Sequence, residues 1–171
     1  ATVTKRPEKF VALHFANEIW KHNTAEIMGH PGTATSVFDD VVDFAKAIGM
    51  ITLPLYKEQP GYILNSLLVP LLGAATNLLV NGVSDVETID KTWMVATGAP
   101  VGPFGILDVV GITTAYNINK MAADKTHDPI KIKTVEFLKE NFIDKGKLGV
   151  ATREGFYNYP DPAYKNKDFL K

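Results

Sequence analysis

The sequence predicts a mainly helical protein in which a small α/β segment precedes a longer helical domain. Up to residue 58, short apolar runs and one stretch of helical spacing alternate in the order strand, strand, helix, strand, which is typical of part of an α/β sheet. After Pro60-Gly61, the apolar residues fall into long segments of helical length. We therefore divide the chain into a first domain over residues 1–58 and a second over residues 59–171.

The α/β segment contains three candidate strands. Residues 10–15 form an apolar run rich in strand-forming residues, as expected of a buried strand. Residues 25–28 form a weaker candidate that is closed by the turn sequence GHPG at residues 29–32. Residues 50–56 form the third candidate strand.

One helix is predicted between the second and third strands. Apolar residues recur there at helical spacing from Val37 to Ile48. We expect Thr35 or Ser36 to cap the start of this helix, and Gly49 stands where a C′ glycine belongs.

The longest predicted helix covers residues 62–80, which are almost wholly apolar. A helix that is apolar on every side must be buried on every side. Pro70 removes one backbone hydrogen bond and is expected to bend the helix. Its most apolar part, residues 67–75, is too short to span a bilayer.

Three more helices are expected in the second domain. The first covers residues 84–96, where Ser84 and Glu87 have the spacing of a capping box. Residues 107–125 and 130–144 are predicted to form the other two.

The composition is that of a soluble globular protein. The 171 residues are 46% hydrophobic and 22% charged, and the formal net charge is −1, so nothing favours nucleic acid or an anionic membrane as a partner. The chain has no cysteine, which excludes disulfides and thiolate metal sites and favours a reducing compartment. The N-terminus lacks the apolar core of a signal peptide, and we expect a cytoplasmic protein.

Three of the four histidines lie within residues 10–30. His14, His22 and His30 are eight residues apart, with Glu18 and Glu26 between them. Metal-binding histidines on a helix are spaced by four residues and those on a strand by two. The observed spacing fits neither pattern, and this disfavours a three-histidine metal site.

His14 differs from the other two because it ends an apolar strand. A histidine in such a place can act as a general base if a carboxylate holds its other ring nitrogen. Glu26 on the neighbouring strand is the better candidate, and Glu18 lies in the loop. The sequence pattern is also compatible with a His14 that has no catalytic role. His22 and His30 are interpreted as loop residues.

Four segments together resemble the L-3-hydroxyacyl-CoA dehydrogenase family and its 3-hydroxybutyryl-CoA dehydrogenases. They are RPEKFVALHFANEIWKHNTAEIM, PGYILNSLLVPLLGAATNLLVNGVSDVETID, GAPVGPFGILDVVGI and GKLGVATREGFYNYP. The four occur in the family's order and are distributed over residues 6–160, so the resemblance extends along nearly the whole chain and is specific.

The resemblance implies a Rossmann-type NAD-binding domain followed by a helical domain that binds substrate and forms a homodimer. Residues 1–58 would be the last part of the NAD-binding domain, and residues 59–171 the whole helical domain. No G-x-G-x-x-G sequence follows a strand here, so most of the NAD site lies outside these residues. We expect this chain to be inactive alone.

The resemblance also assigns roles to individual residues. His14 would take the proton of the substrate's 3-hydroxyl group while hydride passes to the nicotinamide, and Glu26 would orient His14. Asn65 would contact the substrate oxygen, and Asn17 would shape the nicotinamide side of the site. Without the resemblance, Asn65 is equally well explained by a helix-start hydrogen bond and Asn17 by a loop turn.

This chain departs from the family's pattern in three places. Asn17-Glu18 stands where the family has Asn-Pro, Ala16 replaces an aromatic residue, and Val150-Ala151 replaces a basic pair. The expected substrate is a short-chain acyl-CoA, with no membrane or nucleic acid as a partner. Two alternatives stay open: a helical dimerisation module without chemistry, and a related dehydrogenase that acts on another hydroxy acid.

Overall fold

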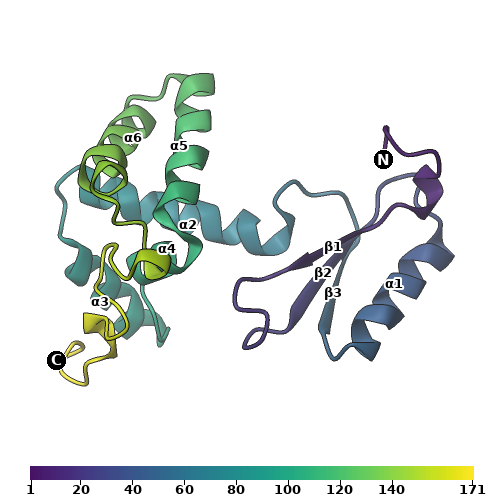
Figure 1. Ribbon diagram of the computed structural model, residues 1–171, viewed down its shortest axis with the longest axis horizontal. Coiled ribbons are helices and arrows are strands. Elements are labelled where there is room, and N and C mark those ends of the chain that lie inside the picture. Colours follow the sequence, from purple (N-terminus) through teal and green to yellow (C-terminus); the bar gives the residue numbers. More distant parts are fainter. The chain divides into compact units, whose positions relative to one another are not determined.

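The computed structural model describes residues 1–171 and is mainly helical (Figure 1). The chain forms two compact units, Ala1–Val69 and Pro70–Lys171. Helix α2 (Tyr62–Val80) begins in the first unit and ends in the second.

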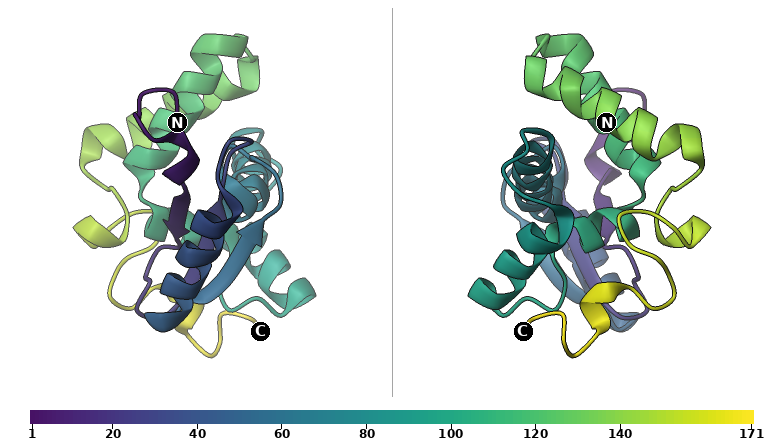
Figure 2. Two further views of the ribbon diagram at one scale, coloured as in Figure 1. Left: turned by 90° about the vertical axis from the view of Figure 1, so that its right-hand side faces the viewer. Right: turned by 90° about the vertical axis from the view of Figure 1, so that its left-hand side faces the viewer.

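The first unit is a small sheet with one covering helix. The strands, in the order β1-β2-β3, are β1 (Ala12–Phe15), β2 (Thr24–Met28) and β3 (Ile51–Leu55). β1 and β2 are antiparallel, whereas β2 and β3 are parallel. A parallel pair needs a crossover connection, and helix α1 (Thr35–Ala47) supplies it and lies alongside the strands (Figures 1 and 2).

The core of this unit lies between the sheet and α1. Ala25 and Ile27 of β2 and Ala45 of α1 are fully buried there. The partly buried residues packed around them are Val11, Leu13, Phe38, Val41, Val42 and Met50. Because side chains alternate along a strand, Glu26 points to the sheet face opposite α1.

Helix α1 confirms the predicted element and corrects its cap. The N-cap is Ala34, which makes no side-chain hydrogen bond, and Thr35 already lies in the first turn. Thr33 precedes the N-cap position, and its hydroxyl accepts from His30 N and donates to Phe10 O. At the other end Gly49 has φ +81°, as a C′ glycine requires.

Helix α2 has the predicted bounds but is not buried on every side. Only Leu72, Ala75, Thr76 and Val80 are buried, while Leu67 is 70% exposed. By length and mean hydropathy (1.8), α2 could cross a membrane, a test that core helices of soluble proteins also pass. The expectation of complete burial is therefore wrong, because part of the apolar surface of α2 is exposed.

Four helices and the glycine- and aromatic-rich loop of residues 146–159, called the closing loop below, complete the second unit. The helices are α3 (Val86–Thr97), α4 (Pro103–Val110), α5 (Ile112–Thr126) and α6 (Pro129–Asn141). α5 and α6 lie side by side (Figure 1). The fully buried apolar side chains of this unit include Phe104, Ile112 and Leu138.

Two predicted details of these helices are wrong. The expected helix over residues 107–125 is interrupted at Gly111, whose φ of +93° ends α4 before α5 begins. The cap of α3 is Asp85 rather than Ser84, because the Asp85 carboxylate accepts from Thr88 N at 2.8 Å. Aspartate and serine are equally good N-cap residues, so the sequence did not separate the two.

Candidate active site

His14 and Glu26 form a cross-strand pair in the first unit. Their Cα atoms are register partners in the antiparallel β1–β2 ladder, and side chains of such partners lie on the same face. His14 Nδ1 and Glu26 Oε2 are 2.9 Å apart. The His14 side chain is 26% exposed and that of Glu26 is 5% exposed, so the pair is buried at its carboxylate end and open at its imidazole end.

The other oxygen of Glu26 holds the first turn of helix α2. Glu26 Oε1 accepts the backbone N–H groups of Ile63 at 2.8 Å and Leu64 at 3.0 Å. The first N–H groups of a helix have no partner within the helix, and the helix dipole favours a negative charge beside them. Both oxygens of Glu26 are therefore hydrogen-bonded within the protein.

The geometry selects one tautomer of neutral His14. A carboxylate can only accept hydrogen bonds, so Nδ1 of His14 must carry the proton that it donates to Glu26. Nε2 is then left without a proton and free to accept one. When it does, the adjacent carboxylate stabilises the imidazolium, which is the arrangement of a general base with an orienting acid.

The two asparagines expected in the site lie on the two segments next to this pair, the turn after β1 and the start of α2. Asn17 is exposed in the turn that follows β1, and its side chain makes no hydrogen bond within the protein. Asn65 is half-buried in the α2 turn that follows the two N–H groups bound by Glu26. Its backbone N–H bonds Gly61 O at 3.1 Å, but its side-chain amide has no protein partner, and the alternative of a helix-start hydrogen bond through that amide is not observed.

The loop after β1 explains one departure from the resembled family. Glu18 has φ +55° and pairs with Lys21 at 2.6 Å. Proline fixes φ near −65°, so a proline at position 18 is incompatible with this loop path.

The remaining two histidines of the cluster are loop residues, as the sequence suggested. His22 is exposed. The His30 ring makes two hydrogen bonds to backbone groups. Its Nδ1 accepts from Gly32 N at 3.1 Å, and its Nε2 lies 2.7 Å from Pro7 O. An imidazole that accepts at Nδ1 and donates at Nε2 is neutral, and this ring holds the loop in place.

Two further carboxylates that sequence reasoning missed are buried in the second unit. Asp90 accepts from Phe104 N, Gly105 N and the Tyr157 hydroxyl at 2.9–3.0 Å. Burial raises the pKa of Asp90, although its hydrogen bonds act in the opposite direction. Gly102 packs so closely on Asp90 that an added Cβ would lie 2.2 Å from its Cγ.

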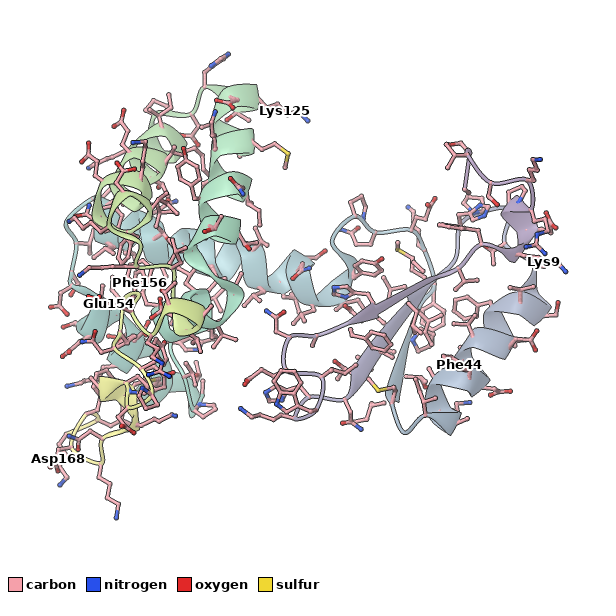
Figure 3. The ribbon with its side chains drawn as sticks, in the orientation of Figure 1. Lys9, Phe44, Lys125, Glu154, Phe156 and Asp168 are labelled. Carbon is pink, nitrogen blue, oxygen red and sulfur yellow. The ribbon has the colours of Figure 1, made fainter.

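Asp108 is bonded in the same manner by the closing loop. It accepts from Phe156 N (labelled in Figure 3), Tyr157 N and the Tyr159 hydroxyl, each at 2.9 Å. Burial raises its pKa above 3.8 against these hydrogen bonds. A Cβ on Gly155 would lie 2.0 Å from Asp108 Oδ1. The glycine- and aromatic-rich loop is thus built around a buried carboxylate, a relation that the spacing of these residues does not reveal.

Two protein-family models together match most of this chain. Residues 1–59 match the model described as "3-hydroxyacyl-CoA dehydrogenase, NAD binding domain", and residues 61–159 match "3-hydroxyacyl-CoA dehydrogenase, C-terminal domain". The two models meet at residues 59–61, just before α2, whereas the first compact unit continues to Val69. The first compact unit thus includes the first turn of α2, whose Ile63 and Leu64 N–H groups bind Glu26.

Curated relatives carry the same description. Human mitochondrial hydroxyacyl-coenzyme A dehydrogenase is 34% identical over 160 residues, which are 93% of this chain and 50% of that protein. The 3-hydroxybutyryl-CoA dehydrogenase of Clostridioides difficile is 28% identical over 159 residues, 93% of this chain and 56% of its own. The chain thus spans about half the length of the curated relatives it matches.

Solved structures include a more similar sequence. A structure described as "substrate-directed dual catalysis of dicarbonyl compounds by diketoreductase" is 58% identical with a TM-score of 0.83, over 91% of this chain and 53% of that chain. The (S)-3-hydroxybutyryl-CoA dehydrogenase of Ralstonia eutropha is 25% identical with a TM-score of 0.76, over 94% and 56% of the two chains.

Proposed function

Because the chain belongs to the 3-hydroxyacyl-CoA dehydrogenase family, we propose that it carries the base for NAD-dependent oxidation of L-3-hydroxyacyl-CoA to 3-oxoacyl-CoA, or for the reverse reduction. One observation supports this most strongly. His14 Nδ1 is bonded to the buried Glu26 at 2.9 Å while the imidazole end of the pair is partly exposed. Nε2 is therefore the free position of a ring whose other nitrogen is fixed.

In the oxidation, His14 Nε2 accepts the proton of the 3-hydroxyl group. The C–H bond of the same carbon breaks, its hydride leaves, and the carbonyl double bond forms. NAD, when bound, supplies the hydride acceptor. Glu26 offsets the positive charge that forms on His14, and the N–H groups of Ile63 and Leu64 hold Glu26 in place. In the reduction, the imidazolium returns the proton to the carbonyl oxygen.

The residues of this chain fit the reacting end of NAD better than its pyrophosphate. The turn from β2 into α1 has glycines at positions 29 and 32, but a Cβ on Gly29 would lie 3.2 Å from Thr33 and one on Gly32 would lie 3.1 Å from the His30 ring. Both glycines are thus contacted by side chains of their own turn, and the turn does not have the G-x-G-x-x-G pattern of a phosphate cradle. We propose that this chain alone neither binds NAD tightly nor turns over substrate, which calorimetry with NAD tests.

A His14→Gln substitution tests the base. The assay supplements the chain with a family NAD-binding domain and follows NADH oxidation with acetoacetyl-CoA. We expect turnover to fall by about 10²- to 10⁴-fold, the usual contribution of a general acid or base, while His22→Gln, at an exposed loop position, leaves it unchanged. Undiminished turnover in His14→Gln would remove this residue from the mechanism.

A second candidate is the reduction of a dicarbonyl compound that carries no CoA. The 58% identity with the diketoreductase structure supports it, because the human acyl-CoA relative is only 34% identical. The same His14–Glu26 pair would protonate the carbonyl oxygen. Parallel assays with acetoacetyl-CoA and ethyl acetoacetate, which share the β-dicarbonyl group, distinguish the two substrates.

We also propose that the chain forms a homodimer through its C-terminal helices. The support is the exposed apolar surface on these helices, which includes Leu67, Leu78, Val95 and Met121. Light scattering should give twice the chain mass of 18.8 kDa, and Leu67→Glu should reduce it. A cytoplasmic location stays our expectation, to be checked with a fluorescent fusion.

A further inference from the structure

Tyr62 stacks directly on the imidazole of His14. The two ring centroids are 4.2 Å apart and the ring planes differ by 5°. Tyr62 also immediately precedes Ile63 and Leu64, whose N–H groups bind Glu26. Three consecutive residues at the start of α2 thus contact both members of the His14–Glu26 pair.

We propose that Tyr62 is a positioning residue for the base: its ring fixes the plane of the His14 imidazole, while Glu26 fixes the rotation of the imidazole within that plane. The proposal rests on the proposed role of His14. It assigns Tyr62 no contact with substrate and no proton transfer of its own.

The two restraints are different and complement each other. A single hydrogen bond at Nδ1 fixes one edge of the imidazole but permits the ring to tilt about that bond. A nearly parallel ring at 4.2 Å opposes this tilt, because tilting would bring ring atoms into overlap. Proton transfer at Nε2 occurs in the plane of the imidazole, so the stack restrains the ring without covering the reacting nitrogen.

The stack also favours the charged product of proton transfer. The face of an aromatic ring attracts a cation that lies within about 6 Å of its centroid. The His14 ring centroid is well inside this distance. The imidazolium is therefore stabilised by Glu26 along its edge and by Tyr62 across its face.

The backbone of Tyr62 indicates that its ring is held in place. Tyr62 has φ +57°, which is rare for a bulky residue and persists only where the surroundings determine it. Its N–H bonds Gln59 O at 2.9 Å, and its carbonyl accepts from the Ser66 hydroxyl. This conformation starts α2 and places the side chain over His14. The simpler explanation is that a half-buried tyrosine only fills space, and the test must distinguish the two.

The first test is spectroscopic and needs only this chain. An aromatic ring over the imidazole shifts the ring-proton NMR signals of His14 upfield. Tyr62→Phe should keep this shift, whereas Tyr62→Leu should lose it. Tyr62→Asn is a second variant without a ring, and asparagine tolerates a positive φ, so it covers the case in which the leucine variant does not fold. Tyr56→Leu, which removes a fully exposed tyrosine of the same unit, is the matched control and should leave the His14 signals unchanged.

The second test is kinetic and uses the chain supplemented with a family NAD-binding domain. Tyr62→Phe should keep kcat, while the leucine and asparagine variants should lower kcat by about 10- to 100-fold, the range for a small misplacement of a catalytic group, with little change in KM. Unshifted His14 signals in wild type, or full kcat in both ringless variants, would overturn the proposal. Loss of kcat in Tyr62→Phe would also overturn it, since the hydroxyl and not the stack would then matter.

The two tests separate this proposal from the proposed function. If His14→Gln keeps its activity, His14 is not the base, but the NMR signals still report whether Tyr62 orders the ring. If His14→Gln is inactive and the ringless variants are fully active, the base is correct and the positioning role of Tyr62 is wrong.

Discussion

Each unit of this chain contains a buried carboxylate that accepts two backbone N–H groups from the start of a helix, but the third partner differs. Glu26 binds the start of α2 and His14, whose side chain is 26% exposed. Asp90 binds the start of α4 and the hydroxyl of Tyr157, which is 5% exposed.

This difference separates a site that can do chemistry from one that holds the fold. The single proton of the Tyr157 hydroxyl is donated to the buried Asp90, and burial raises the pKa of this hydroxyl. An imidazole bonded at Nδ1 keeps a second nitrogen for proton transfer. The buried carboxylate is thus common to both units, and the two differ in whether its third partner keeps an exposed nitrogen for the proposed proton transfer.

The largest effect expected from this comparison is a loss of kcat in the Glu26→Gln variant. In Glu26→Gln, the amide oxygen can still accept from Ile63 and Leu64, but the NH₂ group then faces His14 Nδ1. That nitrogen becomes an acceptor and the proton moves to Nε2, the wrong tautomer for a base. We expect kcat in the supplemented enzyme to fall about 100-fold or more.

Glu18→Gln is the control for this substitution, because Glu18 lies in the neighbouring loop and pairs only with Lys21. It should keep nearly full kcat. Equal losses of kcat in the two glutamine variants would show that Glu26 has no special relation to the base.

The next largest effect is a loss of stability of the second unit in the Gly155→Ala variant. In Gly155→Ala, the added Cβ would lie 2.0 Å from Asp108 Oδ1, so the closing loop must move. We expect a loss of about 3 kcal/mol, the upper part of the usual range for overpacking. Denaturant unfolding followed by the fluorescence of Trp93, in a Trp20→Phe background, reports this unit alone because Trp20 belongs to the first unit.

A glycine in open surroundings is the matched control. A Cβ on Gly73 would lie 3.6 Å from Lys131 Nζ, an ordinary contact. Because Gly73 lies inside α2 and alanine is the better helix former, Gly73→Ala should raise stability by up to about 1 kcal/mol. A Gly155→Ala protein as stable as wild type would contradict the close packing around Asp108.

A smaller loss is expected for Asp108→Asn. The carboxylate accepts from two N–H groups and one hydroxyl, and the NH₂ group of asparagine must face at least one of these donors. Leaving a buried donor without an acceptor costs about 1–3 kcal/mol. The Trp93 unfolding assay measures it, and an unchanged midpoint would show that these hydrogen bonds do not hold the loop.

The smallest effect is a pH dependence from the same residue. Burial raises the folded-state pKa of Asp108 above 3.8, so between 3.8 and that higher pKa the folded unit binds more protons than the unfolded chain. The stability contributed by this group is therefore fully present below about pH 3.8 and is lost as pH rises through the folded pKa. As pH rises, the unfolding free energy of wild type should therefore fall relative to that of Asp108→Asn. A shift in the opposite direction would contradict the raised pKa.

The sequence predicted most of the elements because each has a local cause. The strands follow from short apolar runs, and the bounds of α2 from one long apolar segment after Pro60-Gly61. The pairing of His14 with Glu26 was also within reach, since an antiparallel return of the second strand places them opposite each other.

The contacts between distant segments could not be predicted, because they have no local cause in the sequence. Nothing near Glu26 in the sequence shows that its second oxygen binds Ile63 and Leu64, or that Tyr62 covers His14. Likewise, the relation of Asp108 to Gly155 depends on how the chain packs. These are tertiary contacts, which residue spacing along one segment does not encode.

The most direct test of the central claim is the tautomer of His14. A heteronuclear NMR correlation of the ring nitrogens and ring carbons, recorded in alkaline buffer where imidazoles are neutral, identifies which nitrogen carries the proton. The account predicts that His14 holds its proton on Nδ1 and that Glu26→Gln moves it to Nε2. A wild-type His14 that carries its proton on Nε2 would contradict the account, because the nitrogen assigned to accept the substrate's proton would already be occupied.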